Sequence, residues 1–304
     1  MNQQSKALIT VGITAYNEGS YLKEAWNSVV NQTDNRWEAI MVLDGGADKQ
    51  TKKIFQQIVH PKLKKYVFEE NQGPYGTRIK AIEMSDAKWY YQLDSDDLLP
   101  PNAINDVIKA IENNPKAEFI YGDCEVFSND STNLIKPLSD EEQLCHKTLF
   151  NAASPISKVL YSKIGGYNKS MYINADWDFW LSVYEQHIIG EYTDCMIYKA
   201  RIRKSNVGNK YMHLRPDIVD QIIKRHPVYF NNDQRENAAR FYVLEKLARY
   251  YRSIGDRFNA AKNVRLALQY GDSIPVFKSI LSEEKMSTFR IFIRKIVRLI
   301  TLYV

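Results

Sequence analysis

The sequence is poor in cysteine and histidine, and these shortages exclude several classes of site. Its three cysteines, Cys124, Cys145 and Cys195, lie far apart and form no CxxC pair. Such an odd and scattered set argues against a disulfide framework and against a structural zinc site. The five histidines show no HxxxH spacing, and neither a P-loop nor a GxSxG motif occurs. The sequence motifs of a helical zinc site, a P-loop phosphate site and a serine nucleophile elbow are therefore missing.

Long apolar runs are also missing. No stretch of 18 apolar residues occurs, so the sequence predicts no transmembrane helix. The start, MNQQSKALITVGITAY, has one lysine, a short apolar run interrupted by threonine and no plausible cleavage site. It resembles a first strand more than a signal peptide. The expected location is the reducing cytoplasm.

The charge is low and dispersed. The net charge is +5, with 44% hydrophobic and 25% charged residues, which is ordinary for a globular protein. Basic residues are spread along the chain and form no stripe, which argues against nucleic acid as a partner. The length of 304 residues suffices for a core domain of about 200 residues and a smaller second domain.

Strand and helix signals alternate along the first part of the chain. Strand signals occupy 7–14, 38–43, 64–69 and 89–93, and helical periodicity occupies 20–31, 49–59 and 77–86. The alternation predicts an α/β fold with a mostly parallel sheet flanked by helices. In such sheets ligands bind outside the carboxyl ends of the strands. Polar residues follow three strands, at 17–18, at Asp44 and at 94–97, so we expect them to converge on one edge.

The pattern changes after about residue 210, where strand signals become rare and helical periodicity becomes long. Residues 248–268 are predicted to form two helices joined by Gly255 and Asp256, similar to one tetratricopeptide unit. A single unit of this kind cannot bury its own apolar face. We therefore expect a main domain over 1–210 and a helical region over 211–304 that packs on it.

Three carboxylates, Asp94, Asp96 and Asp97, lie within four positions after the strand at 89–93. Neighbouring carboxylates repel, so they are either solvated turn residues or the surroundings of a cation. Prolines follow closely, which favours a turn or a helix cap for Asp97. A calcium loop of the EF-hand type is excluded, because Leu99 occupies the required glycine position and Asn105 the final glutamate position. Magnesium or manganese, held together with a ligand's phosphates, remains.

Four stretches occur in the order in which they are found in glycosyltransferase family 2. They are VGITAYNEGSYLKEAWNSVVNQ, IMVLDGGADKQT, NQGPYGTRIKAI and YYQLDSDDLLPP. The resemblance covers residues 7 to about 206. The family contains inverting enzymes that use nucleotide-sugars and have the Rossmann-like GT-A fold. The resemblance therefore implies that fold and a glycosyltransferase activity of the hexosyltransferase type.

The resemblance also implies roles for individual residues of a donor site. Ala15, Tyr16 and Glu18 match the loop beneath the base and ribose. Asp44 matches an aspartate that commonly meets the base, and Arg78 matches a basic residue near the nucleotide.

The DxD motif of the family matches Asp94, Ser95 and Asp96. This match implies contact with the donor and with a divalent cation, Mn²⁺ or Mg²⁺. Asp96 is the better candidate for direct contact with the metal.

The segment KIGGYNKSMYINADWDFWLSV (163–183) resembles the acceptor side of the family's site. Asp176 keeps the aspartate that acts there as general base, although Ala175 replaces the preceding glutamate. A base is required, because the acceptor hydroxyl loses its proton as it attacks the anomeric carbon. The alternative makes Asp176 the N-cap of a helix, and both roles are compatible. Trp177 and Trp180 are candidates for stacking on an acceptor sugar, with a core role expected for at least one.

Residues 198–205 (YKARIRKS) resemble a late strand that often carries a metal-binding histidine. Arg203 occupies the histidine position here. Because a guanidinium has only donors, it cannot bind a cation. Arg203 is instead expected to neutralise the diphosphate that leaves. We therefore expect a weaker dependence on metal than the DxD motif alone implies.

The last segment, 286–304, has basic residues on one helical arc and apolar residues on the opposite arc. This pattern predicts a helix in a membrane interface, and hence a protein peripheral to the inner face of the cell membrane. An amphipathic helix packed on the protein is the alternative.

The sequence thus predicts transfer of a sugar from a nucleotide-sugar to a hydroxyl of a glycan or lipid-linked acceptor. By family analogy the setting is bacterial surface polysaccharide biosynthesis. A nucleotidyltransferase is one alternative, but it would need a glycine-rich basic loop where AYNEG stands. A non-catalytic module that binds nucleotide-sugars is the other.

Overall fold

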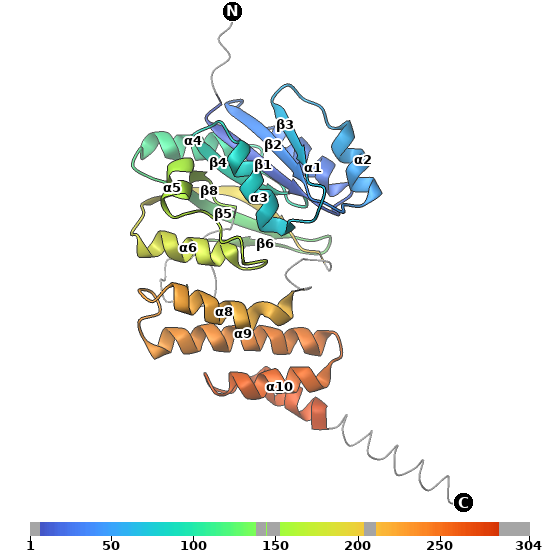
Figure 1. Ribbon diagram of the computed structural model, residues 1–304, viewed down its shortest axis with the longest axis vertical. Coiled ribbons are helices and arrows are strands. Elements are labelled where there is room, and N and C mark those ends of the chain that lie inside the picture. Colours follow the sequence, from blue (N-terminus) through green and yellow to red (C-terminus); the bar gives the residue numbers. More distant parts are fainter. Residues whose placement is uncertain (1–6, 138–143, 145–152, 204–210, 286–304) are drawn as a thin grey trace, which may run out of the picture. The chain divides into compact units, whose positions relative to one another are not determined.

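The computed structural model describes residues 7–137, 144, 153–203 and 211–285 (Figure 1). By internal contacts the chain divides into two compact units, Met1–Lys204 and Ser205–Val304.

The first unit is built on one mixed sheet. In the described residues its order is β3-β2-β1-β4-β7-β5-β6, and β8 also pairs with β5. β1 is parallel to both β2 and β4, and β2 is parallel to β3, whereas β7 is antiparallel to β4 and β5. The strands are β1 (Ile9–Ala15), β2 (Trp37–Leu43), β3 (Leu63–Val67), β4 (Trp89–Asp94), β5 (Phe119–Phe127), β6 (Thr132–Ile135), β7 (Ile156–Ser157) and β8 (Gly190–Arg201). The predicted mostly parallel sheet is confirmed.

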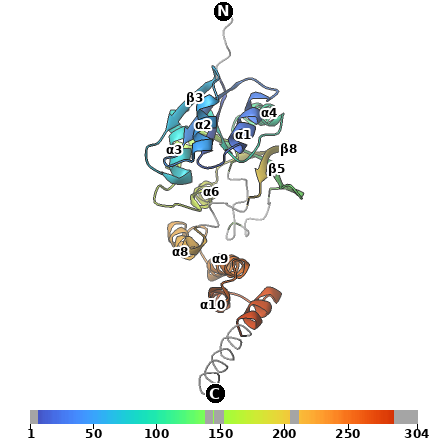
Figure 2. The same ribbon diagram turned by 90° about the vertical axis from the view of Figure 1, so that its right-hand side faces the viewer.

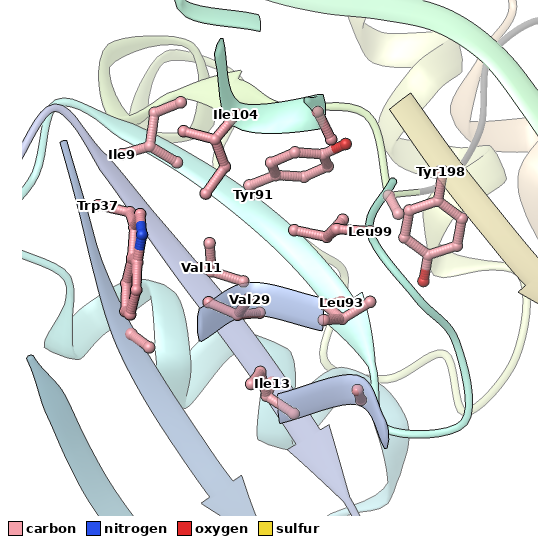
Figure 3. Packing of buried hydrophobic residues seen from close by; sticks show 14 of the residues in the cluster. Ile9, Val11, Ile13, Val29, Trp37, Tyr91, Leu93, Leu99, Ile104 and Tyr198 are labelled. Atoms are coloured by element: carbon pink, nitrogen blue, oxygen red, sulfur yellow. The ribbon is translucent and has the colours of Figure 1, made fainter. Parts of the chain in front are cut away.

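Helices cover both faces of this sheet. They are α1 (Tyr21–Val30), α2 (Lys49–Gln57), α3 (Gly73–Met84), α4 (Ala103–Asn113), α5 (Lys158–Lys163) and α6 (Ala175–Glu185). The main apolar cluster joins β1, β2 and β4 to α1, α2 and α4 and takes nothing from α3. Figure 2 shows α3 and α4 at opposite sides of the unit. In Figure 3, Val11 and Ile13 of β1 lie beside Val29 of α1, and Ile9 lies beside Ile104 of α4.

All seven residues of β1 are buried, which explains why its sequence is continuously apolar and does not alternate. The helix predicted at 77–86 begins four residues earlier, at Gly73. Two features of the sequence set this start. Pro74 suits the first turn of a helix, and Gly73 enters it with a φ of +71° that side chains disfavour. The early start matters, because it places Tyr75 within the helix.

The second unit is helical in its described residues. It contains the short η2 (Met212–Leu214), then α8 (Arg215–Arg225), α9 (Asp233–Ser253) and α10 (Arg257–Ala267), and residues 275–285 are also helical. The predicted two helices joined at Gly255 and Asp256 are confirmed. Gly255 has a φ of +82°, and the Asp256 side chain caps α10. The predicted interfacial helix at 286–304 lies outside the described residues. No helix that the structure describes is both long and apolar enough to span a bilayer.

Candidate active site

The loops after β1 and β4 meet at the carboxyl edge of the sheet, as predicted. Ala15 ends β1 and is buried, and Tyr16 after it is 37% exposed. The Glu18 carboxylate accepts hydrogen bonds at one oxygen, Oε2, from the Tyr16 amide (2.6 Å) and from the buried Ser95 hydroxyl (2.9 Å). Glu18 therefore ties the loop after the first strand to the DxD segment.

Asp94 is paired with Arg78 of α3. One guanidinium nitrogen, Nη2, donates to both carboxylate oxygens of Asp94, at 2.9 and 2.7 Å. Gln92 and Thr14 also donate to Asp94 Oδ1. Burial acts to raise the pKa of Asp94, but the Arg78 charge and these hydrogen bonds outweigh it and lower that pKa. Asp94 is thus an ionised carboxylate whose charge the protein already balances.

Asp96 is paired with Arg203, which follows the end of β8. The Arg203 Nε donates to Asp96 Oδ2 at 2.6 Å, and its Nη2 lies 3.6 Å from Glu18 Oε1. The three side chains are 15–18% exposed, so the group lies mostly out of water. Burial and the nearby Asp94 charge raise the pKa of Asp96 against the opposing effect of Arg203. The structure therefore brings together the DxD motif and the arginine that replaces the family's histidine.

Asp97 closes the turn after β4, because its amide donates to the Asp94 carbonyl at 3.0 Å, but it is neither solvated nor a helix cap, which corrects part of the favoured interpretation. It is 9% exposed, and the N-cap of α4 is Asn102. Its carboxylate accepts hydrogen bonds from the Tyr198 hydroxyl (2.9 Å) and the Arg201 amide (2.7 Å), so it joins β4 to the end of β8. Burial and the charges of Asp94 and Asp96 raise the pKa of Asp97 to about 8. The third carboxylate thus positions the strand that delivers Arg203.

A divalent cation fits this edge through one oxygen. Among the described residues no three His, Cys, Asp or Glu side chains are grouped as a metal site. Arg78 holds both oxygens of Asp94, whereas Asp96 Oδ1 accepts no hydrogen bond from another described residue. One carboxylate completed by phosphate oxygens and water is an arrangement that Mg²⁺ accepts. A cation here would compete with Arg203 for Asp96.

Asp44 directly follows β2, and its carboxylate accepts hydrogen bonds from neighbouring segments of the same chain. Its oxygens accept hydrogen bonds from the amides of Gly45, Gln72 and Gly73 and from the Asn71 side chain, at 2.7–3.0 Å. Four partners fill the usual capacity of a carboxylate. A direct contact between Asp44 and the base stays a prediction, and it would require the exchange of one of these hydrogen bonds. Asp44 instead fixes the loop that starts α3.

Asp176 lies in the first turn of α6, two residues after the N-cap Asn174. The alternative that made Asp176 the N-cap is therefore wrong. The hydroxyl of Tyr75, from α3, donates to Asp176 Oδ1 at 2.5 Å. No lysine or arginine in the described residues forms an ion pair with Asp176. A carboxylate at a helix N-terminus is favoured by the helix dipole.

The two tryptophans of α6 are core residues, which contradicts their candidacy as stacking faces for a sugar. Trp177 and Trp180 are each 2% exposed. The Trp177 indole N–H donates to the Leu144 carbonyl, and Trp180 packs edge-on against Phe119 and Phe179. A ring enclosed in this way offers no free face to a ligand.

A cavity of about 360 Å³ lies beside α3. Tyr75 and Lys80 of α3 line one part of it, and Lys169, Met171 and Tyr172 line another. Tyr75 therefore borders this cavity, and its hydroxyl contacts Asp176.

Sequence reasoning missed Tyr75, Asn71 and Tyr198 as parts of the site. A signal existed for Tyr75, because it stands three residues before Arg78 and so shares its helix face. No local signal existed for Tyr198, whose contact with Asp97 joins residues 101 positions apart.

Known proteins resemble this chain in sequence and in fold. Residues 10–174 match the family Glycosyl transferase family 2. An uncharacterized glycosyltransferase of Methanocaldococcus jannaschii is 28% identical over 235 residues, which are 69% of this chain and 80% of that protein.

Two solved structures share the fold. S. aureus TarS 1-349 in complex with UDP-GlcNAc has a TM-score of 0.57 at 16% identity and covers 86% of this chain and 81% of its own. The mannosyltransferase PcManGT from Pyrobaculum calidifontis, in complex with GDP-Man and Mn²⁺, has a TM-score of 0.57 at 13% identity and covers 94% and 81%. The chain belongs to glycosyl transferase family 2 and is a glycosyltransferase with the GT-A fold.

Proposed function

We propose that this glycosyltransferase moves a sugar, with inversion, from a nucleotide-sugar to a hydroxyl of a glycan or lipid-linked acceptor. The observation that carries the proposal is the pairing of Asp94 and Asp96 with Arg78 and Arg203 at the sheet edge, while Asp176 has no cationic partner among the described residues. The first group suits a diphosphate and the second suits a base. Bacterial surface polysaccharide assembly is the proposed setting, by family analogy.

On the donor side, Tyr16, which is exposed after β1, would contact the base and ribose, and Arg203 would contact the diphosphate. Arg203 has fixed donors that would face negative charge as the diphosphate leaves. A bound Mn²⁺ or Mg²⁺ would supply further positive charge to those phosphates. Asp96 would hold this cation, and Asp94 and Ser95 complete the DxD motif to which Asp96 belongs.

On the acceptor side, Asp176 takes the hydroxyl proton. As the acceptor oxygen bonds to the anomeric carbon, the bond from that carbon to the diphosphate oxygen breaks and the electron pair leaves with the diphosphate. The carboxylate accepts the proton at the same time, so charge and atoms balance. Attack from the face opposite the diphosphate inverts the anomeric centre.

A donor screen tests the proposal. Melting temperature and release of nucleoside diphosphate are measured with UDP-GlcNAc, other UDP-sugars and GDP-mannose, with and without manganese. One donor is expected to raise the melting temperature and to be cleaved slowly with water as acceptor. If no donor raises the melting temperature and none is cleaved, the proposal is wrong.

The alternatives receive less support. A nucleotidyltransferase needs amides free to cradle phosphates after the first strand, and here the Tyr16 amide is held by Glu18. A non-catalytic binding module would bind a donor without cleaving it. Donor cleavage by wild type that is lost in Asp176→Asn would show that the protein is an enzyme and not a binding module.

A peripheral attachment to the membrane through residues 286–304 is also proposed, from their sequence alone. Deleting these residues should release the protein from anionic vesicles, and high salt should weaken binding of the intact chain. If neither the deletion nor high salt changes co-sedimentation with vesicles, the alternative of a helix packed on the protein is favoured.

A further inference from the structure

Tyr75 is a buried residue of α3 whose hydroxyl points at the proposed base. It is 8% exposed, and its hydroxyl donates to Asp176 Oδ1 at 2.5 Å. The two residues are 101 positions apart, so this hydrogen bond joins α3 to α6. Burial and the Asp176 charge raise the pKa of Tyr75 well above its ordinary value. The hydroxyl therefore remains a hydrogen-bond donor at any ordinary assay pH.

The hydrogen bond holds one oxygen of the base and leaves the other open. Oδ2 of Asp176 accepts no hydrogen bond from the residues that the structure describes. The Asp176 amide also approaches the Tyr75 hydroxyl, at 3.4 Å. With Oδ1 held, the direction of Oδ2 is set. A fixed direction matters, because proton transfer needs the acceptor hydroxyl and the carboxylate oxygen in hydrogen-bond geometry.

Tyr75 is in turn held by the donor side of the site. The Arg78 guanidinium lies over its ring, 5.3 Å from the centroid, and the same guanidinium binds both oxygens of Asp94. Tyr167 packs on the ring with centroids 5.5 Å apart. Tyr75 and Arg78 are one helical turn apart, so a single face of α3 contacts both the base and the DxD motif.

We infer that Tyr75 is a positioning residue, which orients Asp176 for proton removal and ties the base to Asp94 through α3. The inference rests on the proposed function, in which Asp176 takes the proton. It assigns Tyr75 no contact with the reacting atoms. Its effect on turnover passes entirely through Asp176.

A double-mutant cycle tests this. Wild type, Tyr75→Phe, Asp176→Asn and the double variant are compared by release of nucleoside diphosphate from the donor that the panel identifies. Tyr75→Phe should slow release about 10-fold with donor affinity within about twofold of wild type, because positioning acts on turnover. In the Asp176→Asn background the same change should cost nothing further, because a residue that acts through Asp176 has nothing left to position.

Tyr161→Phe is the matched control. The Tyr161 hydroxyl also makes a hydrogen bond, accepting from the Tyr167 amide, and its ring packs against Tyr167. Removal of the Tyr161 hydroxyl should leave the rate of nucleoside diphosphate release unchanged. The inference is overturned if Tyr75→Phe releases at the wild-type rate, if it loses donor affinity, or if its effect multiplies with that of Asp176→Asn. Full activity of Asp176→Asn would instead overturn the proposed base, which keeps the two failures distinct.

Discussion

The carboxylates of this site are held in two different ways. Asp94 and Asp96 are each bonded to an arginine, whereas Asp176 is bonded to a neutral tyrosine hydroxyl and has no ion pair in the described part of the chain. The contrast separates two chemical tasks. Under the proposed function, the arginine-paired Asp94 and Asp96 organise charge around a diphosphate, and Asp176 takes a proton.

The largest expected effect comes from removing the Asp96 carboxylate, which has one oxygen available to a cation. Asp96→Ala should reduce transfer about 1,000-fold, because a metal contact is worth several kcal/mol in the transition state. Turnover is measured with and without manganese. Asp34→Ala is the matched control, because Asp34 is also paired with an arginine, Arg36, but lies before β2 at the other end of the strands. Unchanged activity in Asp96→Ala would refute the metal assignment.

The next effect concerns the base. Asp176→Asn keeps the shape of the side chain but cannot accept a proton at neutral pH. Turnover should fall about 100-fold or more. Rates of nucleoside diphosphate release measure it, and a rate near that of wild type would leave Asp176 without a chemical role.

The third effect concerns Arg203, which would compete with a bound cation for Asp96. Arg203→Ala should lower turnover about 10- to 100-fold and make the remaining activity more dependent on manganese, since Asp96 and Glu18 are freed together. Arg203→His should recover activity only with metal present, because imidazole can bind a cation.

A manganese titration of wild type and both Arg203 variants measures this change. Arg36→Ala is the control, since Arg36 also bridges two carboxylates, Asp34 and Glu112. If activity depends on manganese concentration in the same way in wild type and Arg203→Ala, Arg203 has no role in catalysis.

The smallest effect concerns stability and Asp97, the carboxylate that joins the two strands of the donor edge. Its pKa of about 8 in the folded protein exceeds the value of about 3.9 expected when unfolded. The folded state therefore binds more protons between these values, and its stability falls as the pH rises from about 4 to about 8.

Asp97→Asn should flatten this dependence. Between pH 5 and pH 8, with chelator present, the melting temperature of wild type should fall by about 3 °C or more beyond that of the variant. The exposed Asp130→Asn is a control that should keep the wild-type slope. Parallel slopes for wild type and Asp97→Asn would contradict the burial argument.

Elements of the fold could be predicted because their signals are local. The apolar run of β1, the periodicity of α1 and the Gly255–Asp256 turn each specify structure within a few residues. The sequence predicts the start of α3 four residues too late, because helical periodicity does not reveal the start that Gly73 and Pro74 set.

The pairing of the site residues could not be predicted in this way. Arg203 meets Asp96 across 107 positions, and Tyr75 meets Asp176 across 101. Motif matching supplied Asp94 and Asp96, the arginines Arg78 and Arg203, and Asp176, but not how they pair, and it missed Tyr75. It also did not supply the contacts of Asp44 with residues 71–73, because these contacts depend on the fold of that loop.

The most direct test of the division between donor edge and base is donor affinity, measured by calorimetry on wild type, Asp96→Ala and Asp176→Asn. The donor is the nucleotide-sugar that the panel identifies, with manganese present. The account predicts that Asp96→Ala binds this donor at least about 10-fold more weakly, while Asp176→Asn binds it within about twofold of wild type despite its loss of turnover. Donor affinity that collapses in Asp176→Asn, or survives intact in Asp96→Ala, would contradict it.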